Sequence, residues 1–226
     1  MTIILTNDDG IDAPGIRALQ NALNGAGKIV APSTHQSGCS HQLTTGRPIK
    51  IERRSTGDVA IAAMPADCAR IAVKCFYPDT SWVLSGINAG GNLGADVPVS
   101  GTVAAVREAA YLRVPGIAIS HYIHRGRAID WDIATRLTAK VIDKLMAQPY
   151  EVGTFWNVNL PHLTPDDPDP ELVMCSACTQ PLPTDYDLDG DTIQYVGSYG
   201  ERDRDPGGDV DVCFSGKIAV TKIRLW

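Results

Sequence analysis

Near its start the chain reads Ile3-Ile4-Leu5-Thr6-Asn7-Asp8-Asp9-Gly10, the stretch that decides the fold. The apolar first half is typical of a buried strand, and Asp12-Ala13-Pro14-Gly15-Ile16 after it is typical of a helix start. We therefore expect Asp8 and Asp9 at the carboxyl end of a first strand, where open parallel sheets bind ligands. Adjacent carboxylates repel unless a cation lies between them or one is protonated, and oxygen ligands favour Mg²⁺ or Mn²⁺ over zinc. A solvated turn would also explain these residues.

Strand and helix patterns alternate along the chain as far as residue 161. This alternation predicts an α/β fold, a doubly wound and mostly parallel sheet with helices on both faces. Residues 1–161 are expected to form the catalytic core, and residues 162–226 a β-rich C-terminal extension, or arm, with a closing strand, within the same single domain. Segment 209–214 fits either a strand or a short helix. Strands are expected at 28–32, 59–62, 82–85, 117–120, 155–160, 172–174, 193–196 and 217–223, and helices at 16–23, 65–73, 102–112 and 133–145.

Composition excludes several classes of protein. The chain has 226 residues, of which 44% are hydrophobic, enough for one core but not for two full domains. Its formal net charge of −6 argues against non-specific binding of long nucleic acids, which needs basic patches. No apolar run reaches the roughly 18 residues of a membrane span, and no signal peptide is recognised, so a cytoplasmic protein is expected. Cys175-Ser176-Ala177-Cys178 lacks the two further ligands that a zinc site needs.

Three further segments carry residues suited to a ligand. Asn88 and Asn92 stand among four glycines after the expected strand 82–85, in a pattern that is neither a dinucleotide fingerprint nor a P-loop. Ser100 is a candidate helix N-cap, which would leave the N–H groups of Gly101 and Thr102 free to bind phosphate. Ser37, in the polar loop 33–48, could add a hydroxyl to a metal site. A flexible turn and an ordinary serine cap remain the alternatives for the first two segments.

Together these motifs resemble the survival protein SurE family of 5′/3′-nucleotidases. The resemblance covers nearly the whole chain and is firm over residues 1–161. It rests on Thr6 to Ile11, Ala31-Pro32 with Ser37-Gly38, Pro65 to Cys68, Ser85 to Gly94, Ser100 to Thr102, and Asn157 to Pro161, in that order.

The resemblance implies a metal-dependent phosphomonoesterase that hydrolyses nucleoside 5′- and 3′-monophosphates, with short polyphosphate as a further substrate to test. It implies a Rossmann-like core and a C-terminal β extension exchanged between subunits, and hence a homodimer or homotetramer. One divalent ion per subunit, Mg²⁺ or Mn²⁺, would be held by Asp8, Asp9, Ser37 and Asn88, and the two aspartates would be catalytic. The residues expected to bind phosphate or substrate are Asn7, Asn92, Ser100, Gly101 and Thr102.

One departure from the family pattern affects the expected substrate contacts, because Ala63-Met64 stands where the family usually has Gly-Thr.

Three other functions are weighed. A haloacid-dehalogenase-type phosphatase spaces its aspartates as Asp-x-Asp, whereas here they are adjacent. A nucleotide-binding regulatory module would bind without turnover, and a structural subunit would not need clustered oxygen ligands. The preferred nucleotide, the physiological metal, the choice of water or aspartate as nucleophile, and dimer against tetramer stay open.

Overall fold

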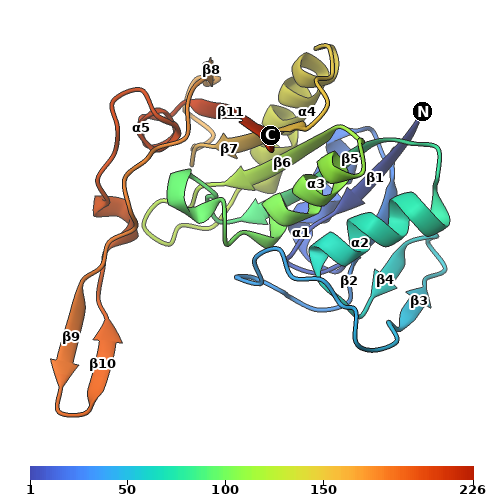
Figure 1. Cartoon of the computed structure of the whole chain (residues 1–226). Helices are drawn as coiled ribbons and strands as arrows, with labels where there is room; N and C mark the ends of the chain where they lie inside the picture. The colour runs from blue at the N-terminus through green and yellow to red at the C-terminus, as the bar shows by residue number, and fades with distance from the viewer.

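A nine-stranded, mostly parallel sheet forms the centre of the molecule in the computed structural model, which describes residues 1–226 (Figure 1). Two of its strand pairs are antiparallel, and all the others are parallel. The predicted α/β class is thereby confirmed. In spatial order the strands are β3 (Ile51–Arg53), β4 (Val59–Ile61), β2 (Lys28–Pro32), β1 (Thr2–Thr6), β5 (Thr80–Ala89), β6 (Gly116–His121), β7 (Thr154–Leu160), β11 (Ile218–Arg224) and β8 (Leu172–Met174).

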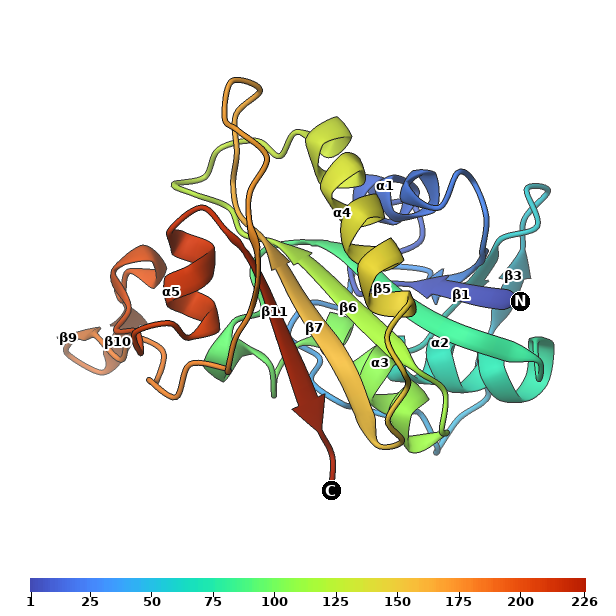
Figure 2. The ribbon, with the colours of Figure 1, turned by 90° about the horizontal axis from the view of Figure 1, so that it is seen from above.

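Helices cover both faces of this sheet, as Figure 2 shows from above. The helices are α1 (Pro14–Ala22) and α4 (Trp131–Met146) on one face, and α2 (Pro65–Ile71), extended by the π-helical turn η1 (Ala72–Phe76), and α3 (Gly101–Tyr111) on the other. Ile16 of α1 and Leu137 of α4 belong to the same buried apolar cluster. Cys68 of α2 and Val103 of α3 belong to a second cluster on the other face. None of the helices is both long and apolar enough to cross a membrane.

β1 lies in the middle of the sheet and is buried, as its sequence predicts. The side chains of Ile4 and Leu5 are 0% exposed, and burying each contributes about 1.5–3 kcal/mol relative to exposure. Burial continues past the end of the strand, because Asn7 and Asp8 are also buried. The chain therefore passes from the hydrophobic core directly into a polar and equally buried segment.

β5 is longer than the expected strand 82–85, since it runs through the glycine-rich segment as far as Ala89. Gly86 makes this possible: its φ is +137°, and a Cβ there would lie 2.2 Å from the carbonyl oxygen of Ile119 in β6. Only glycine allows the two strands to approach so closely. Ile87 is then buried, and Asn88 reaches the carboxyl edge of the sheet.

One part of the C-terminal extension adds strands to the main sheet, and another part forms a separate hairpin. β11 pairs with β7 and β8, and Ile218 and Val220 belong to the same apolar cluster as α1 and α4. β9 (Tyr186–Asp189) and β10 (Thr192–Tyr195) form a separate two-stranded hairpin that projects from the body (Figure 1). Segment 209–214, which the sequence left open, is the helix α5 (Asp209–Phe214), and it buries Val210 and Cys213.

Candidate active site

The topology of the sheet has a switch point beside the end of β1, and the region outside the strand ends there, at Asp8, Asp9 and Asn88, is called the crevice below. From β1 the chain crosses to β2 on one side, and it later returns as β5 on the other side. In open α/β sheets the ligand lies outside the carboxyl ends of the strands at such a switch point. Asp8 and Asp9 follow β1, and Asn88 is the penultimate residue of β5. The predicted carboxylates and the predicted amide therefore come from the two strands that flank this crevice.

Asp8 is almost fully buried, at 3% exposure. Its Oδ1 accepts a hydrogen bond from the Thr102 hydroxyl of α3, and its backbone oxygen accepts one from the Gln36 N–H at 2.7 Å. Burial raises the pKa of the Asp8 carboxyl, the Thr102 hydrogen bond partly opposes the rise, and the neighbouring charge of Asp9 adds to it. The groups that touch Asp8 are a hydroxyl and an amide rather than a lysine or an arginine.

Asp9 is more accessible, and it is tied to the end of β5. Its Oδ2 accepts a hydrogen bond from the Ala89 N–H at 3.1 Å, and its Oδ1 lies 3.5 Å from Nδ1 of His35. Asn88 donates from Nδ2 to the Gly90 carbonyl at 2.8 Å, so that hydrogen bond leaves its Oδ1 available as an acceptor. The structure thus brings Asp8, Asp9 and Asn88 together.

Ser37 lies in a turn that is held against Asp8 by the hydrogen bond from the Gln36 N–H to the Asp8 backbone oxygen. The Cys39 N–H donates to the Gln36 carbonyl at 3.2 Å, and Gly38 supplies the positive φ of +72° that the turn requires. Ser40 then anchors the far side of the turn, through its N–H to the Val99 carbonyl at 3.0 Å. The Ser37 side chain itself is exposed. Burial and the Asp8 charge raise the pKa of the Cys39 thiol to about 11, which keeps it a neutral neighbour of Asp8.

α3 begins at the site as the sequence predicts. Ser100 is its N-cap and accepts a hydrogen bond from the Val103 N–H at 3.1 Å. Gly101 is packed so tightly that a Cβ would lie 2.8 Å from Asp8 Cβ and 2.8 Å from Cys39 Sγ. The first N–H groups of the helix have no partner within the helix and make its N-terminus suited to an anion.

The two other predicted substrate residues are buried among polar groups. Asn7 donates to the Gly10 carbonyl at 2.8 Å, and its Oδ1 is buried without a partner. Asn92 donates from Nδ2 to the Ser120 hydroxyl at 2.7 Å. Its backbone oxygen accepts from Asn157 at 2.8 Å and from Asn159 at 3.0 Å. The side chain of Asn92 is thus engaged with β6, and its backbone with β7.

Sequence reasoning assigned no role to His35, Ser120, Asn157 or Asn159. The alternation Asn157-Val158-Asn159 places both amides on one face of a strand, which was the available signal. Their common partner, Asn92, could not be read from the sequence, because it lies 67 residues before Asn159. Ser120, Asn157 and Asn159 hold the glycine-rich loop in place through Asn92, whereas His35 lies beside Asp9.

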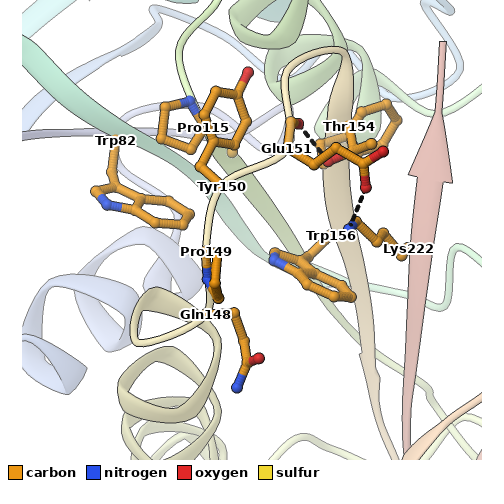
Figure 3. Close-up of a pocket in the computed structure, with 11 residues that line it drawn as sticks. Trp82, Pro115, Gln148, Pro149, Tyr150, Glu151, Thr154, Trp156 and Lys222 are labelled. Carbon is orange, nitrogen blue, oxygen red and sulfur yellow. Dashed lines mark hydrogen bonds and ion pairs between the residues drawn. The ribbon is translucent and has the colours of Figure 1, made fainter. Parts of the chain in front are cut away.

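A second concave surface lies at the opposite edge of the sheet (Figure 3). Trp82, Pro115 and Thr154 line it, at or near the amino ends of β5, β6 and β7. Its charged residues neutralise each other, since Lys222 donates to Glu151 at 2.6 Å. Because this surface lies at the amino ends of the strands, it is separate from the crevice at their carboxyl ends, where the aspartates lie.

A metal at the crevice would have to be held by mixed oxygen donors. The structure contains no group of three or more His, Cys, Asp and Glu side chains arranged to hold a metal. Asp8 and Asp9 supply two carboxylates, and Asn88 and Ser37 would have to supply neutral oxygens. Such a donor set suits Mg²⁺ or Mn²⁺, which commonly keep several waters, better than zinc.

Comparisons with known proteins agree on one family. The family model described as survival protein SurE matches residues 3–181. A protein of Nostoc sp. (strain PCC 7120), provisionally named a 5′-nucleotidase, is 59% identical over 226 residues and covers 100% of both chains. A protein of Xanthomonas axonopodis pv. citri named 5′-nucleotidase SurE is 35% identical over 238 residues, covering 100% of this chain and 90% of its own.

A solved structure gives the same answer for the fold. The crystal structure of the SurE protein from Aquifex aeolicus matches with a TM-score of 0.85 and 28% identity, over 100% of this chain and 94% of that one. The match covers the C-terminal extension as well as the core. The motifs, the topology and the relatives therefore converge, and this chain belongs to the survival protein SurE family.

Proposed function

We propose that this protein is a metal-dependent phosphomonoesterase that hydrolyses nucleoside 5′- and 3′-monophosphates to nucleoside and phosphate. The observation that carries the proposal is the buried Asp8 beside Asp9 at the switch point, in contact with the first turn of α3. Burying a carboxylate is costly unless a cation offsets it, and the contacts of Asp8 include no basic side chain. The relatives named 5′-nucleotidase support the substrate class.

The residues present fit one divalent cation per subunit. Asp8 and Asp9 would supply its anionic ligands, and the Asn88 amide oxygen and the Ser37 hydroxyl its neutral ones. Asn88 suits this role because its Nδ2 is bound to the Gly90 carbonyl, which orients the oxygen of the same amide away from that carbonyl. When bound, the cation would neutralise charge on the phosphoryl oxygens.

The protein's own groups would do the rest of the positioning. The N-terminus of α3, at Gly101 and Thr102, would stabilise the negative charge of the phosphoryl oxygens. Thr102 fixes the orientation of the Asp8 carboxylate through its hydroxyl, and the Ala89 N–H does the same for Asp9. Asp9 is the carboxylate that a substrate can reach more easily, because its side chain is 14% exposed. Asn7 and Asn92 would shape the walls behind these groups.

A substrate panel tests this function. The protein is incubated with nucleoside 5′- and 3′-monophosphates and with short polyphosphate, each with Mg²⁺, with Mn²⁺ and with a chelator. We expect both monophosphate classes to release phosphate with either metal and none with the chelator. Nucleotide binding without metal-dependent turnover would contradict the proposal and favour a regulatory module. The panel also ranks the metals and the position of the phosphate.

We also propose that residues 162–226 extend the 1–161 core within one domain and carry the contacts for self-association. One face of the β9–β10 hairpin is apolar and exposed: Leu188 is 76% and its cross-strand partner Ile193 is 67% exposed, and the next pair on that face is Tyr186 and Tyr195. A two-stranded hairpin is marginally stable alone, and exposed apolar strands favour pairing with another chain. A second copy of this chain is therefore the expected partner.

The six free cysteines agree with a reducing, cytoplasmic setting.

The double substitution Leu188→Lys and Ile193→Lys is expected to shift the protein from a dimer or tetramer towards the monomer. Two adjacent charges on the hairpin face would have to be buried in the assembled form, at a cost of several kcal/mol. Light scattering after size exclusion measures the mass. Val152→Lys, at a site 51% exposed and outside the hairpin, is the control. An unchanged mass for the double variant would argue against assembly through the hairpin.

A further inference from the structure

A cavity of about 380 Å³ lies beside the glycine-rich loop and takes no part in holding the predicted metal or phosphate. Its walls are the loop 122–126, which follows β6, and the turn η3 (Tyr199–Glu201) with Ser198 before it. A volume of ~300–1,000 Å³ is usual for a small-molecule site. In Figure 1 these walls belong to the segments that follow β6 and β10.

The position of the cavity relates it to the crevice. Asn88 and Ala89 of β5 pair with Ser120 and His121 of β6, so the loop that begins at Tyr122 starts one strand away from the predicted metal ligand. Neighbouring strands are about 4.8 Å apart. On the other wall, a Cβ at Gly91 would lie 3.3 Å from Oη of Tyr199. The cavity therefore adjoins the loop that leads from Asn88 to α3.

The chemistry of the walls suits a flat aromatic ring with polar edges. Tyr122, His124 and Tyr199 supply three aromatic rings, and the ring centroids of Tyr122 and Tyr199 are 6.5 Å apart. Ser198 and Glu201 add hydrogen-bonding groups at the rim. Aromatic side chains stack with any base, because every base has a π-face.

The walls are held in place before any ligand binds. Tyr122 stacks on Phe214 of α5 with a centroid distance of 4.4 Å. Asp96 accepts hydrogen bonds from the Tyr199 hydroxyl at 2.5 Å and from the buried Arg202 at 3.0 Å, and it also accepts one from the Leu93 N–H at 3.0 Å. One carboxylate thus joins the cavity wall to the glycine-rich loop. Such preorganisation reduces the entropy lost on binding.

We propose that this cavity binds the base of the nucleoside monophosphate while its phosphate lies at the Asp8–Asp9 crevice. This subsite rests on the proposed function and adds to it the part of the protein that recognises the nucleoside. Because stacking tolerates different bases, the site distinguishes nucleotides from phosphate esters without a base more strongly than it distinguishes one base from another.

Gly200→Leu tests the subsite by filling it. A Cβ at Gly200 would point towards the Tyr122 hydroxyl, 4.0 Å away, without a clash, and the residue has no positive φ. We expect the KM for adenosine 5′-monophosphate to rise roughly tenfold or more, the size of a lost stacking contact, with kcat unchanged. The KM for ribose 5-phosphate, which has no base, should not change. His124→Ala removes one of the three aromatic rings. It should likewise raise the KM for adenosine 5′-monophosphate and leave the KM for ribose 5-phosphate unchanged.

The matched control is Gly46→Leu, since a Cβ at Gly46 meets nothing within 4 Å and the residue also has no positive φ. It should leave all kinetic constants unchanged. An unchanged nucleotide KM in Gly200→Leu, or an equal rise for ribose 5-phosphate, would overturn the subsite and leave the proposed function standing. Failure of the wild-type protein to hydrolyse either ester with any metal would overturn the proposed function, and the subsite with it.

Discussion

Asp8→Asn is expected to lower kcat/KM for a nucleoside monophosphate by roughly 100-fold or more, a loss typical of removing a central charge-stabilising group. The substitution deletes one of two anionic ligands while keeping the size of the side chain and one oxygen. Steady-state kinetics with saturating Mn²⁺ or Mg²⁺ measures the loss. The same variant should lose most of the rise in Tm that the metal gives the wild-type protein. Near-normal turnover would refute the assignment of Asp8.

The metal-free variant should also be more stable than the metal-free wild type, because a buried charge has been removed. The pH dependence gives the sign. Burial raises the pKa of Asp8 in the folded protein above its ordinary value of 3.8, so the unfolded chain ionises first as pH rises. The stability of the folded protein therefore falls as the pH rises from the ordinary pKa of this carboxyl through its raised pKa in the folded protein, and it returns as the pH falls. In Asp8→Asn this contribution is absent, which thermal melts without metal at several pH values would detect.

Asp12→Asn is the matched control, because Asp12 is exposed and pairs with Arg54 at the surface. Exposed ion pairs contribute only about 0–1 kcal/mol. Its kinetic constants and its response to metal should equal those of the wild type. If Asp12→Asn lost as much activity as Asp8→Asn, the effect of Asp8 could not be attributed to the crevice.

Gly101→Ala is expected to cost about as much activity, roughly 100-fold, although it adds a single methyl group. The added Cβ would lie 2.8 Å from Asp8 Cβ and 3.0 Å from its Oδ2, so the carboxylate or the helix must move. A displacement of about 1 Å at a catalytic group can reduce the rate by that factor. Overpacking should also lower the free energy of unfolding by about 1–3 kcal/mol, even though alanine is the better helix former.

Kinetics and chemical denaturation together measure the two effects of Gly101→Ala. Gly46→Ala serves as its control, since the space around Gly46 is open. A Gly101→Ala protein with wild-type kcat/KM would show that the start of α3 and Asp8 need not be in close contact for catalysis.

Much of the fold could be predicted because its main strands are apolar and buried. β1 and β6 lie inside the mostly parallel sheet and read as short apolar runs bounded by polar residues. β3 and β9 were missed for the opposite reason. Ile51–Arg53 is a three-residue edge strand with every residue exposed, and Tyr186–Asp189 contains two aspartates, which are depleted in strands. Neither buries a face that would leave a pattern.

The site could be predicted where a local rule sufficed. Asp8 and Asp9 follow a strand, and Ser100 precedes a helix, so their positions follow from neighbouring residues. The Thr102–Asp8 hydrogen bond joins residues 94 positions apart, and no local pattern encodes it. The cavity wall at Tyr199 likewise depends on Asp96, 103 positions away, and it emerges only from the folded chain.

The pairing of β1 with β5 has a consequence for how the protein becomes competent. Thr2 lies opposite Thr80 in this pair, and the first turn of α3 comes later still in the chain. Closing so long a loop costs chain entropy before any contact is gained, which makes such parallel pairing intrinsically slow. A nascent chain emerging from the ribosome would therefore carry Asp8 and Asp9 without an assembled centre around them at least until the first turn of α3 has been made.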